Sequence, residues 1–216
     1  MKKCIAKLMI LLLFSGIIFF PINIYAEENS DSEGKKSVHT SAERLEYKEE
    51  RVILTGNVVI IRDENRITSD NAELFRDENR AEIEDNVKAE YNQGTVNSRR
   101  LSAYMEEDRY VFEEDVVLVH NTAGGDEMTL ESPYLELFTE DNSFNARDDV
   151  VINYQGRILK ADNADYNGKT EILTLVDNVE IEDNGDWIRS EKAEFDLASE
   201  DEFTAEGAVE LEFEID

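Results

Sequence analysis

Residues able to carry catalytic or metal chemistry are few and widely separated in this chain of 216 residues. It contains one cysteine, Cys4, and two histidines, His39 and His120. One thiol and two distant imidazoles can supply neither a disulfide framework nor the four ligands of a structural zinc site. His39 precedes the first strand pattern and His120 begins a loop, so we expect both to be solvated polar residues. The sequence predicts no metal site and no cofactor.

Carboxylates and serines are more numerous, but they form no recognisable catalytic constellation. With 51 Asp and Glu residues, no single pair stands out as an acid–base couple. The sequence DENR at 63–66 and 77–80 lacks the ligand spacing of a calcium loop and predicts turns. No Gly-rich phosphate loop or nucleophile elbow is present, so we expect no enzyme. A serine recurs at one position of the repeat described below, where we expect a small residue at a bend: Ser69, Ser98, Ser132 and Ser190.

Composition excludes two further classes. The net charge of −29 would repel nucleic-acid phosphates, so a nucleic-acid partner is not expected. The hydrophobic fraction of 41% is too high for a disordered acidic tail and is sufficient to form a core.

The first residues have the character of an export signal. Lys2, Lys3 and Lys7 precede a short apolar run, and the acidic chain begins after Ala26. This pattern predicts a signal peptide over 1–26, with a retained membrane anchor as the alternative, and a protein working outside the cytoplasm. Residues 27–38 are polar and predict a flexible linker, followed by one domain over 39–216.

The rest of the chain repeats one unit six times. A valine with apolar residues six and four positions before it and two after it recurs about every 29 residues, with one longer interval. A second apolar pattern precedes each copy. The anchor valines are Val58, Val87, Val116, Val150, Val179 and Val209.

Both patterns alternate with a period of two, which is typical of β-strands with one apolar face. Each pattern slips once in its middle, and both halves keep the same face inward only if the strand bends there. The sequence therefore predicts an all-β fold of about 12 bent antiparallel strands that enclose an apolar interior.

The interior has two readings, a filled core or a groove for acyl chains that does not close fully. At the two ends of the stack, exposed edges would pair with other chains through Leu45, Tyr47, Val209, Leu211 and Phe213. We expect the groove to be lined by Leu54, Val58, Ile60, Leu74, Ile83, Val87, Tyr110, Phe112, Val116, Leu118, Leu135, Leu137, Phe144, Val150, Ile152, Tyr166, Leu175, Val179, Ile181 and Phe195.

Two segments resemble a known family. Ser41–Ile61 (SAERLEYKEERVILTGNVVII) and Ile67–Leu74 (ITSDNAEL) are similar to the LptA/OstA family of lipopolysaccharide transport, whose relatives include LptC and the N-terminal domain of LptD. The resemblance extends over residues 40–213. It implies an elongated β-jellyroll, or β-taco, V-shaped in section, which holds lipid A acyl chains and joins end to end with its partners.

The resemblance implies a periplasmic, non-enzymatic bridge or shuttle that carries lipopolysaccharide from the inner to the outer membrane. Its partners would be the lipid, an inner-membrane LptC-like protein, an outer-membrane LptD-like protein and further copies of itself. One alternative is an LptC-like subunit that keeps its N-terminal anchor. Another is a structural cell-surface β-solenoid with a solid core. The strong acidity departs from what the family leads us to expect, because an acidic surface repels an anionic headgroup. We therefore expect the headgroup to stay outside in solvent.

Overall fold

The computed structural model describes residues 37–199 and 202–213, and they form strands joined by turns. The predicted signal peptide and nearly all of the predicted linker lie outside the described residues. The last linker residue, Val38, already belongs to the first strand. Among the described residues there is no helix with the length and apolar character needed to cross a membrane.

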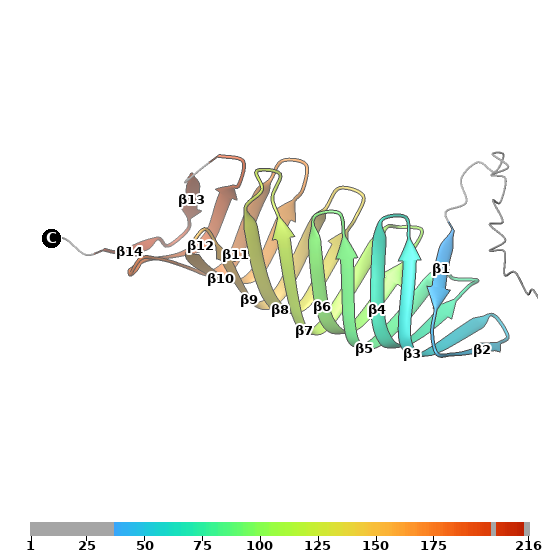
Figure 1. Cartoon of the computed structure of the whole chain (residues 1–216). Coiled ribbons are helices and arrows are strands. Elements are labelled where there is room, and N and C mark those ends of the chain that lie inside the picture. The colour runs from blue at the N-terminus through green and yellow to red at the C-terminus, as the bar shows by residue number, and fades with distance from the viewer. Residues whose placement is uncertain (1–36, 200–201, 214–216) are drawn as a thin grey trace, which may run out of the picture. The chain divides into compact units, whose positions relative to one another are not determined.

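All the strands belong to one open antiparallel sheet, in which consecutive long strands are neighbours in space (Figure 1). The strands are β1 (Val38–Ser41), β2 (Arg44–Lys48), β3 (Arg51–Arg62), β4 (Asn65–Phe75), β5 (Arg80–Tyr91), β6 (Gly94–Tyr104), β7 (Arg109–Asn121), β8 (Glu127–Phe138), β9 (Ser143–Tyr154), β10 (Arg157–Asn167), β11 (Ile172–Asp183), β12 (Asp186–Asp196), β13 (Phe203–Glu206) and β14 (Glu210–Glu212).

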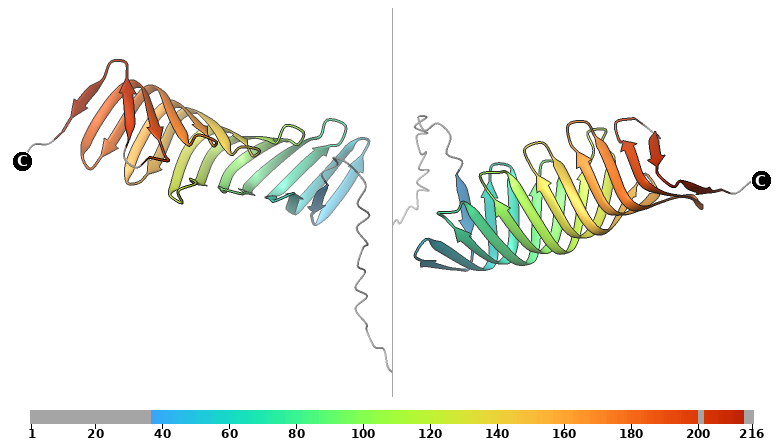
Figure 2. Two further views of the ribbon diagram at one scale, coloured as in Figure 1. Left: turned by 90° about the horizontal axis from the view of Figure 1, so that it is seen from above. Right: turned by 180° about the vertical axis from the view of Figure 1, so that it is seen from behind.

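At each end of the sheet, two short strands take the place of one bent strand. β1 and β2 pair with the two halves of β3, and β13 and β14 pair with the two halves of β12. Counting each such pair once gives the 12 bent antiparallel strands that the sequence predicts, so the predicted fold class is confirmed. Figure 2 shows the bent strands stacked along one long axis.

A two-residue bulge bends every second long strand. In β5, Asp85 and Asn86 both adopt left-handed backbone conformations, with φ of 64° and 53°, and together face one residue of β6. β7, β9 and β11 each carry an equivalent left-handed pair just before the anchor valine, and β3 uses Gly56 and Asn57. Asn, Asp and Gly tolerate this conformation best, which explains why the bends are polar and acidic.

The alternate strands bend at the recurring serine. The hydroxyls of Ser69, Ser98, Ser132 and Ser190 donate hydrogen bonds of 2.8–3.0 Å to the backbone carbonyl two residues further on. The sequence-based expectation of a small residue at a bend is confirmed, but the hydroxyl has a structural role that size alone does not predict. In β10 the equivalent residue is Ala161, which lacks this bond.

The bends can be tested at Asp149, whose φ is 54°. We expect Asp149→Val to lower the free energy of unfolding by about 1–2 kcal/mol, because a β-branched residue is strained in this region. Asp149→Gly should leave stability unchanged or raise it, because glycine has no such strain. Urea unfolding of both variants makes the comparison, and equal loss in the two would show that the left-handed conformation is not the cause.

Candidate functional site

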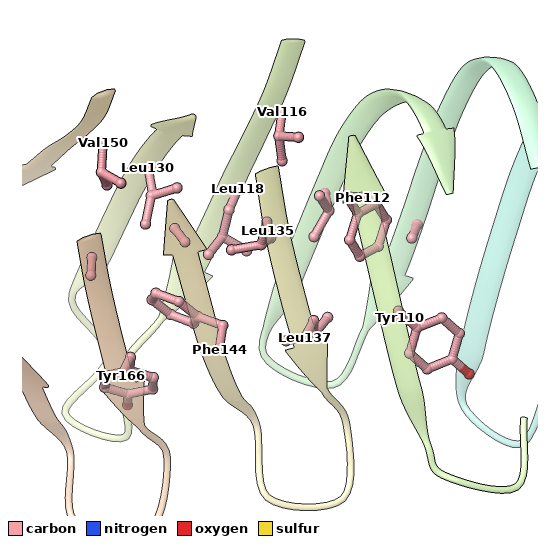
Figure 3. Packing of buried hydrophobic residues seen from close by; sticks show 14 of the residues in the cluster. Tyr110, Phe112, Val116, Leu118, Leu130, Leu135, Leu137, Phe144, Val150 and Tyr166 are labelled. Carbon is pink, nitrogen blue, oxygen red and sulfur yellow. The ribbon is translucent and has the colours of Figure 1, made fainter. Parts of the chain in front are cut away.

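The two halves of the bent sheet face each other across an apolar interior. Figure 3 shows Tyr110 and Phe112 from the first half of β7 and Val116 and Leu118 from its second half, all directed into this space. Every predicted lining residue is buried except Leu74, which is partly buried and packs against the same cluster. The alternation of apolar residues therefore identified the inner face correctly, whereas their role in binding a ligand stays a prediction.

The interior is filled by its own side chains. A partly open cavity at the N-terminal end has a volume of about 10 Å³, and it lies among Ile60, Ile83, Met105 and Tyr110. That is room for about one water molecule. In this conformation the inner side chains of the two halves belong to one buried cluster, and the expected groove for acyl chains stays a prediction.

Two lips border the interior on the side opposite the bends. The first lip consists of the turns at 63–64, 92–93, 122–126, 155–156 and 184–185. The second lip consists of the turns at 49–50, 76–79, 105–108, 139–142 and 168–171.

Side chains, not backbone strand pairing, hold the lips together. Arg62 at the first lip forms a 2.9 Å ion pair with Asp108 at the second, and the guanidinium is almost fully buried. Further along, the backbone N–H of Ala123 donates to the carboxylate of Glu171 across the opening. These contacts close the interior without joining the two halves into one continuous sheet.

The innermost residues of the first lip form a polar row. Four residues after each of the first five anchor valines, the inner face carries Arg62, Tyr91, His120, Tyr154 and Asp183, which we call the lip row. The first four are buried, and Asp183 forms a 2.9 Å ion pair with Arg157. Sequence reasoning missed this row, although its regular position after the anchors was a readable signal.

His120 lies in the middle of the lip row and contradicts the expectation of a solvated histidine. Its exposed fraction is 0%, and its Nδ1 lies 2.7 Å from the hydroxyl of Tyr91. Its ring meets those of Phe144 and Tyr166 from the opposite half edge to face, at 5.7 and 4.9 Å between centroids. The expectation failed because the residue that begins the loop still faces inward. His39 is exposed, as predicted.

Burial controls the ionisation of this cluster. It lowers the pKa of His120 to about 4, so the imidazole is neutral near pH 7. Burial also raises the pKa of Tyr91, and it raises the pKa of Tyr166 to about 12. All three side chains are therefore uncharged around neutral pH, as an apolar surrounding requires.

The described residues offer an apolar surface rather than a cluster of reactive groups. Among residues 37–199 and 202–213, no group of three potential metal ligands comes together. The recurring serine hydroxyls are engaged by the backbone at the bends, away from the lips. What remains is a long apolar interior with a polar row at one lip.

The predicted partner-pairing residues lie at the two ends of the stack. Leu45 and Tyr47 in β2 are 60% and 57% exposed, and Leu211 in β14 is 58% exposed. Val209 and Phe213 are exposed beside it. Leu45 and Leu211 stand opposite Leu54 and Ile188, so they continue the inner face where no further strand of residues 37–199 and 202–213 covers it.

The buried His120 predicts a pH dependence of folding. An unfolded histidine binds a proton near pH 6.5, but folded His120 does so only near pH 4, so the stability gained from the neutral form is lost as pH falls through this window. We expect His120→Phe to flatten the decline of unfolding free energy between pH 7 and 5, measured by urea unfolding. His39→Phe controls for replacing an exposed histidine. An unchanged slope in His120→Phe would contradict a neutral buried imidazole.

Comparison with known proteins gives three findings. The crystal structure of LptH, the LptA-homologous periplasmic component of the lipopolysaccharide transport device from Pseudomonas aeruginosa, is similar over 83% of this chain and 96% of its own, with 9% identity and a TM-score of 0.33. At this level of similarity we draw no conclusion from it. No curated protein matches the chain.

Residues 37–201 match the model of the LptA/LptD N-terminal domain family of lipopolysaccharide (LPS) transport proteins. This match spans most of the chain and the whole bent sheet from β1 to β12, and the chain therefore belongs to this family.

Proposed function

We propose that this protein is a periplasmic carrier that holds the acyl chains of lipopolysaccharide between its two sheet halves and passes them from the inner towards the outer membrane. Membership of the LPS transport family supports this role. The observation that carries the proposal is the continuity of the apolar inner face, which extends through all the long strands and is interrupted by no charged side chain between the bends and the lips.

Entry of a lipid requires the lips to separate. The bonds between Arg62 and Asp108 and between Ala123 and Glu171 would break, while the strand pairing at the bends would remain. Acyl chains would then replace the contacts that the two halves make with each other. Burial of a chain contributes about 0.8 kcal/mol per CH₂ group, so several chains together offset the separation of apolar surfaces.

The headgroup would remain outside the lips in water. The outer faces carry most of the acidic residues, and several of the arginines there are held by carboxylates, such as Arg109 by Glu107 and Glu136. An anionic headgroup gains little from such a surface, and the net charge instead keeps the chain soluble. Affinity should therefore come from the acyl chains rather than from the headgroup.

The filled interior favours one competing function, a structural β-solenoid with a solid core. A cavity of about 10 Å³ is what such a protein would show at rest. A second alternative, the membrane-anchored LptC-like role, depends on residues 1–26, which lie outside the described residues. The two candidates differ from the carrier in whether the inner face ever contacts lipid and in whether the N-terminus is retained.

Photocrosslinking from inside and outside distinguishes the carrier from the solid core. A photoreactive residue in place of Phe112, which is fully buried, should capture LPS in the presence of the transport machinery. The same residue in place of Glu113, the outward neighbour, should not. Adducts are identified by mass spectrometry. Capture from position 113 but not 112 would refute binding between the sheet halves.

We further propose that the ends of the stack pair with partner strands, an LptC-like protein and an LptD-like protein or further copies of this chain. The uncovered inner face at Tyr47 and Leu211 supports this. A photoreactive residue at position 211 should give protein–protein adducts in the periplasm, detected as higher-mass species. Position 117, on the outer face of central β7, is the matched control. Equal adducts from positions 117 and 211 would exclude end-to-end pairing.

A further inference from the structure

The two lips differ in chemistry. The lip row at the first lip presents guanidinium, phenol and imidazole groups to the interior, at Arg62, Tyr91, His120 and Tyr154. The inner positions of the second lip are mainly apolar or aromatic, with Tyr110, Leu137, Phe144, Tyr166 and Leu173. A core that only needed to be filled would gain nothing from this asymmetry, because each buried polar group costs free energy unless it is hydrogen-bonded.

The pair formed by Tyr91 and His120 leaves one donor free. Tyr91 is a neutral phenol whose hydroxyl lies 2.7 Å from Nδ1 of His120, and the imidazole tautomer decides which of the two groups donates. We assign the hydroxyl as the donor, because a phenol O–H is more acidic than a neutral imidazole N–H, and this assignment places the imidazole proton on Nε2. That nitrogen is buried and has no hydrogen-bond partner among the described residues. The faces of the neighbouring Phe144 and Tyr166 rings are weak acceptors at best.

A glycine lies between the two residues of this pair. Along the first lip, Tyr91 pairs with Gly94, and Gly94 pairs with His120, so Gly94 lies between the two side chains. A side chain at Gly94 has no room, because its Cβ would lie 2.0 Å from the carbonyl oxygen of Val119. The absence of a side chain lets the backbones of β6 and β7 approach closely beside the pair.

A second buried donor without a partner occupies the same row. Nη1 of Arg62 makes no hydrogen bond, although Nη2 is paired with Asp108. Arg62 also borders the small cavity at the N-terminal end of the interior. Four buried side-chain atoms of the described residues have no hydrogen-bond partner: Nη1 of Arg62, Nε2 of His120 and the side-chain oxygens of Gln93 and Asn142. The two nitrogens occupy equivalent positions of different repeats in the lip row, where an acceptor that enters from the opening would satisfy them.

We propose that the lip row is a polar subsite of the interior, where Nε2–H of His120 and Nη1–H of Arg62 donate hydrogen bonds to oxygen atoms at the head end of a bound acyl chain. The acceptors would be hydroxyl groups or ester and amide carbonyls on its first few carbons. This inference rests on the proposed binding of acyl chains between the sheet halves.

The depth of the row selects this class of acceptor. His120 is the next-to-last residue of β7, so it lies only about one strand residue, roughly 3 Å, inside the lip. A headgroup held in solvent would remain outside, and the middle of an acyl chain would reach Leu118 and Val116 deeper in the interior. Only the segment that joins headgroup and chain lies level with the row.

Binding of two matched probes tests the subsite. We would measure the affinity of the protein for tetradecan-1-ol and for tetradecane, each delivered from the same detergent at one salt concentration, by titration calorimetry. The alcohol should bind roughly three- to tenfold more tightly, the effect of one hydrogen bond. His120→Phe should bind both probes equally. His39→Phe, the same change at an exposed site, should retain the preference.

A spectroscopic signal separates recognition from a structural role. In ¹⁵N-labelled protein, tetradecan-1-ol should shift the Nε2–H resonance of His120 downfield, and tetradecane should not. Equal binding of both probes with an unmoved resonance would overturn the subsite and leave a buried water as the partner of Nε2. Failure of the wild type to bind either probe would instead contradict the proposed function.

Discussion

The two-residue bulge in every second long strand is the constraint on which the structure depends. Without a bend at this level, residues three positions apart, such as Ser69 and Ala72 of β4, would lie on opposite faces of the sheet. With it, both face inward, and Gly56 and Asn57 of the β3 bulge together lie opposite Asp70. The left-handed pairs at the bulges restrict these positions to glycine, Asn and acidic residues. Thus one backbone feature explains the bent sheet, the apolar interior and part of the acidity of the chain.

The backbone joins the two halves of the sheet only at the bends. The opposite side is closed by side-chain contacts, which are weaker than strand pairing. The lips meet through the Arg62–Asp108 ion pair, the Ala123–Glu171 hydrogen bond and the rings around His120. Separating them exposes apolar surface at a cost of about 25 cal/mol per Å². A lipid that covers the same surface offsets that cost, so the interior serves as the protein's core when empty and as a binding site when occupied.

Much of this architecture was predictable because a repeat multiplies each local signal. The inward positions around Val116, for example, recur in every unit, and the structure buries them as expected. The closed state of the interior was not predictable, because residue spacing along a strand does not determine the distance between facing halves. His120 was misjudged for a related reason, since its partner Tyr91 comes from the preceding repeat. The role of the serines at the bends was not predictable either, because the sequence does not show whether a serine hydroxyl bonds the backbone or a ligand.

The most direct test of this account is the distance across the lips with and without lipid. Spin labels at Ala123 and Lys169, both exposed on turns of opposite lips, report the opening, and labels at Ala123 and Gln155 on the same lip are the control. Pulsed electron resonance should show the Ala123–Lys169 distance lengthen when lipopolysaccharide is bound, while the Ala123–Gln155 distance stays constant. An unchanged Ala123–Lys169 distance in protein shown by mass spectrometry to hold lipid would contradict entry of the acyl chains between the lips.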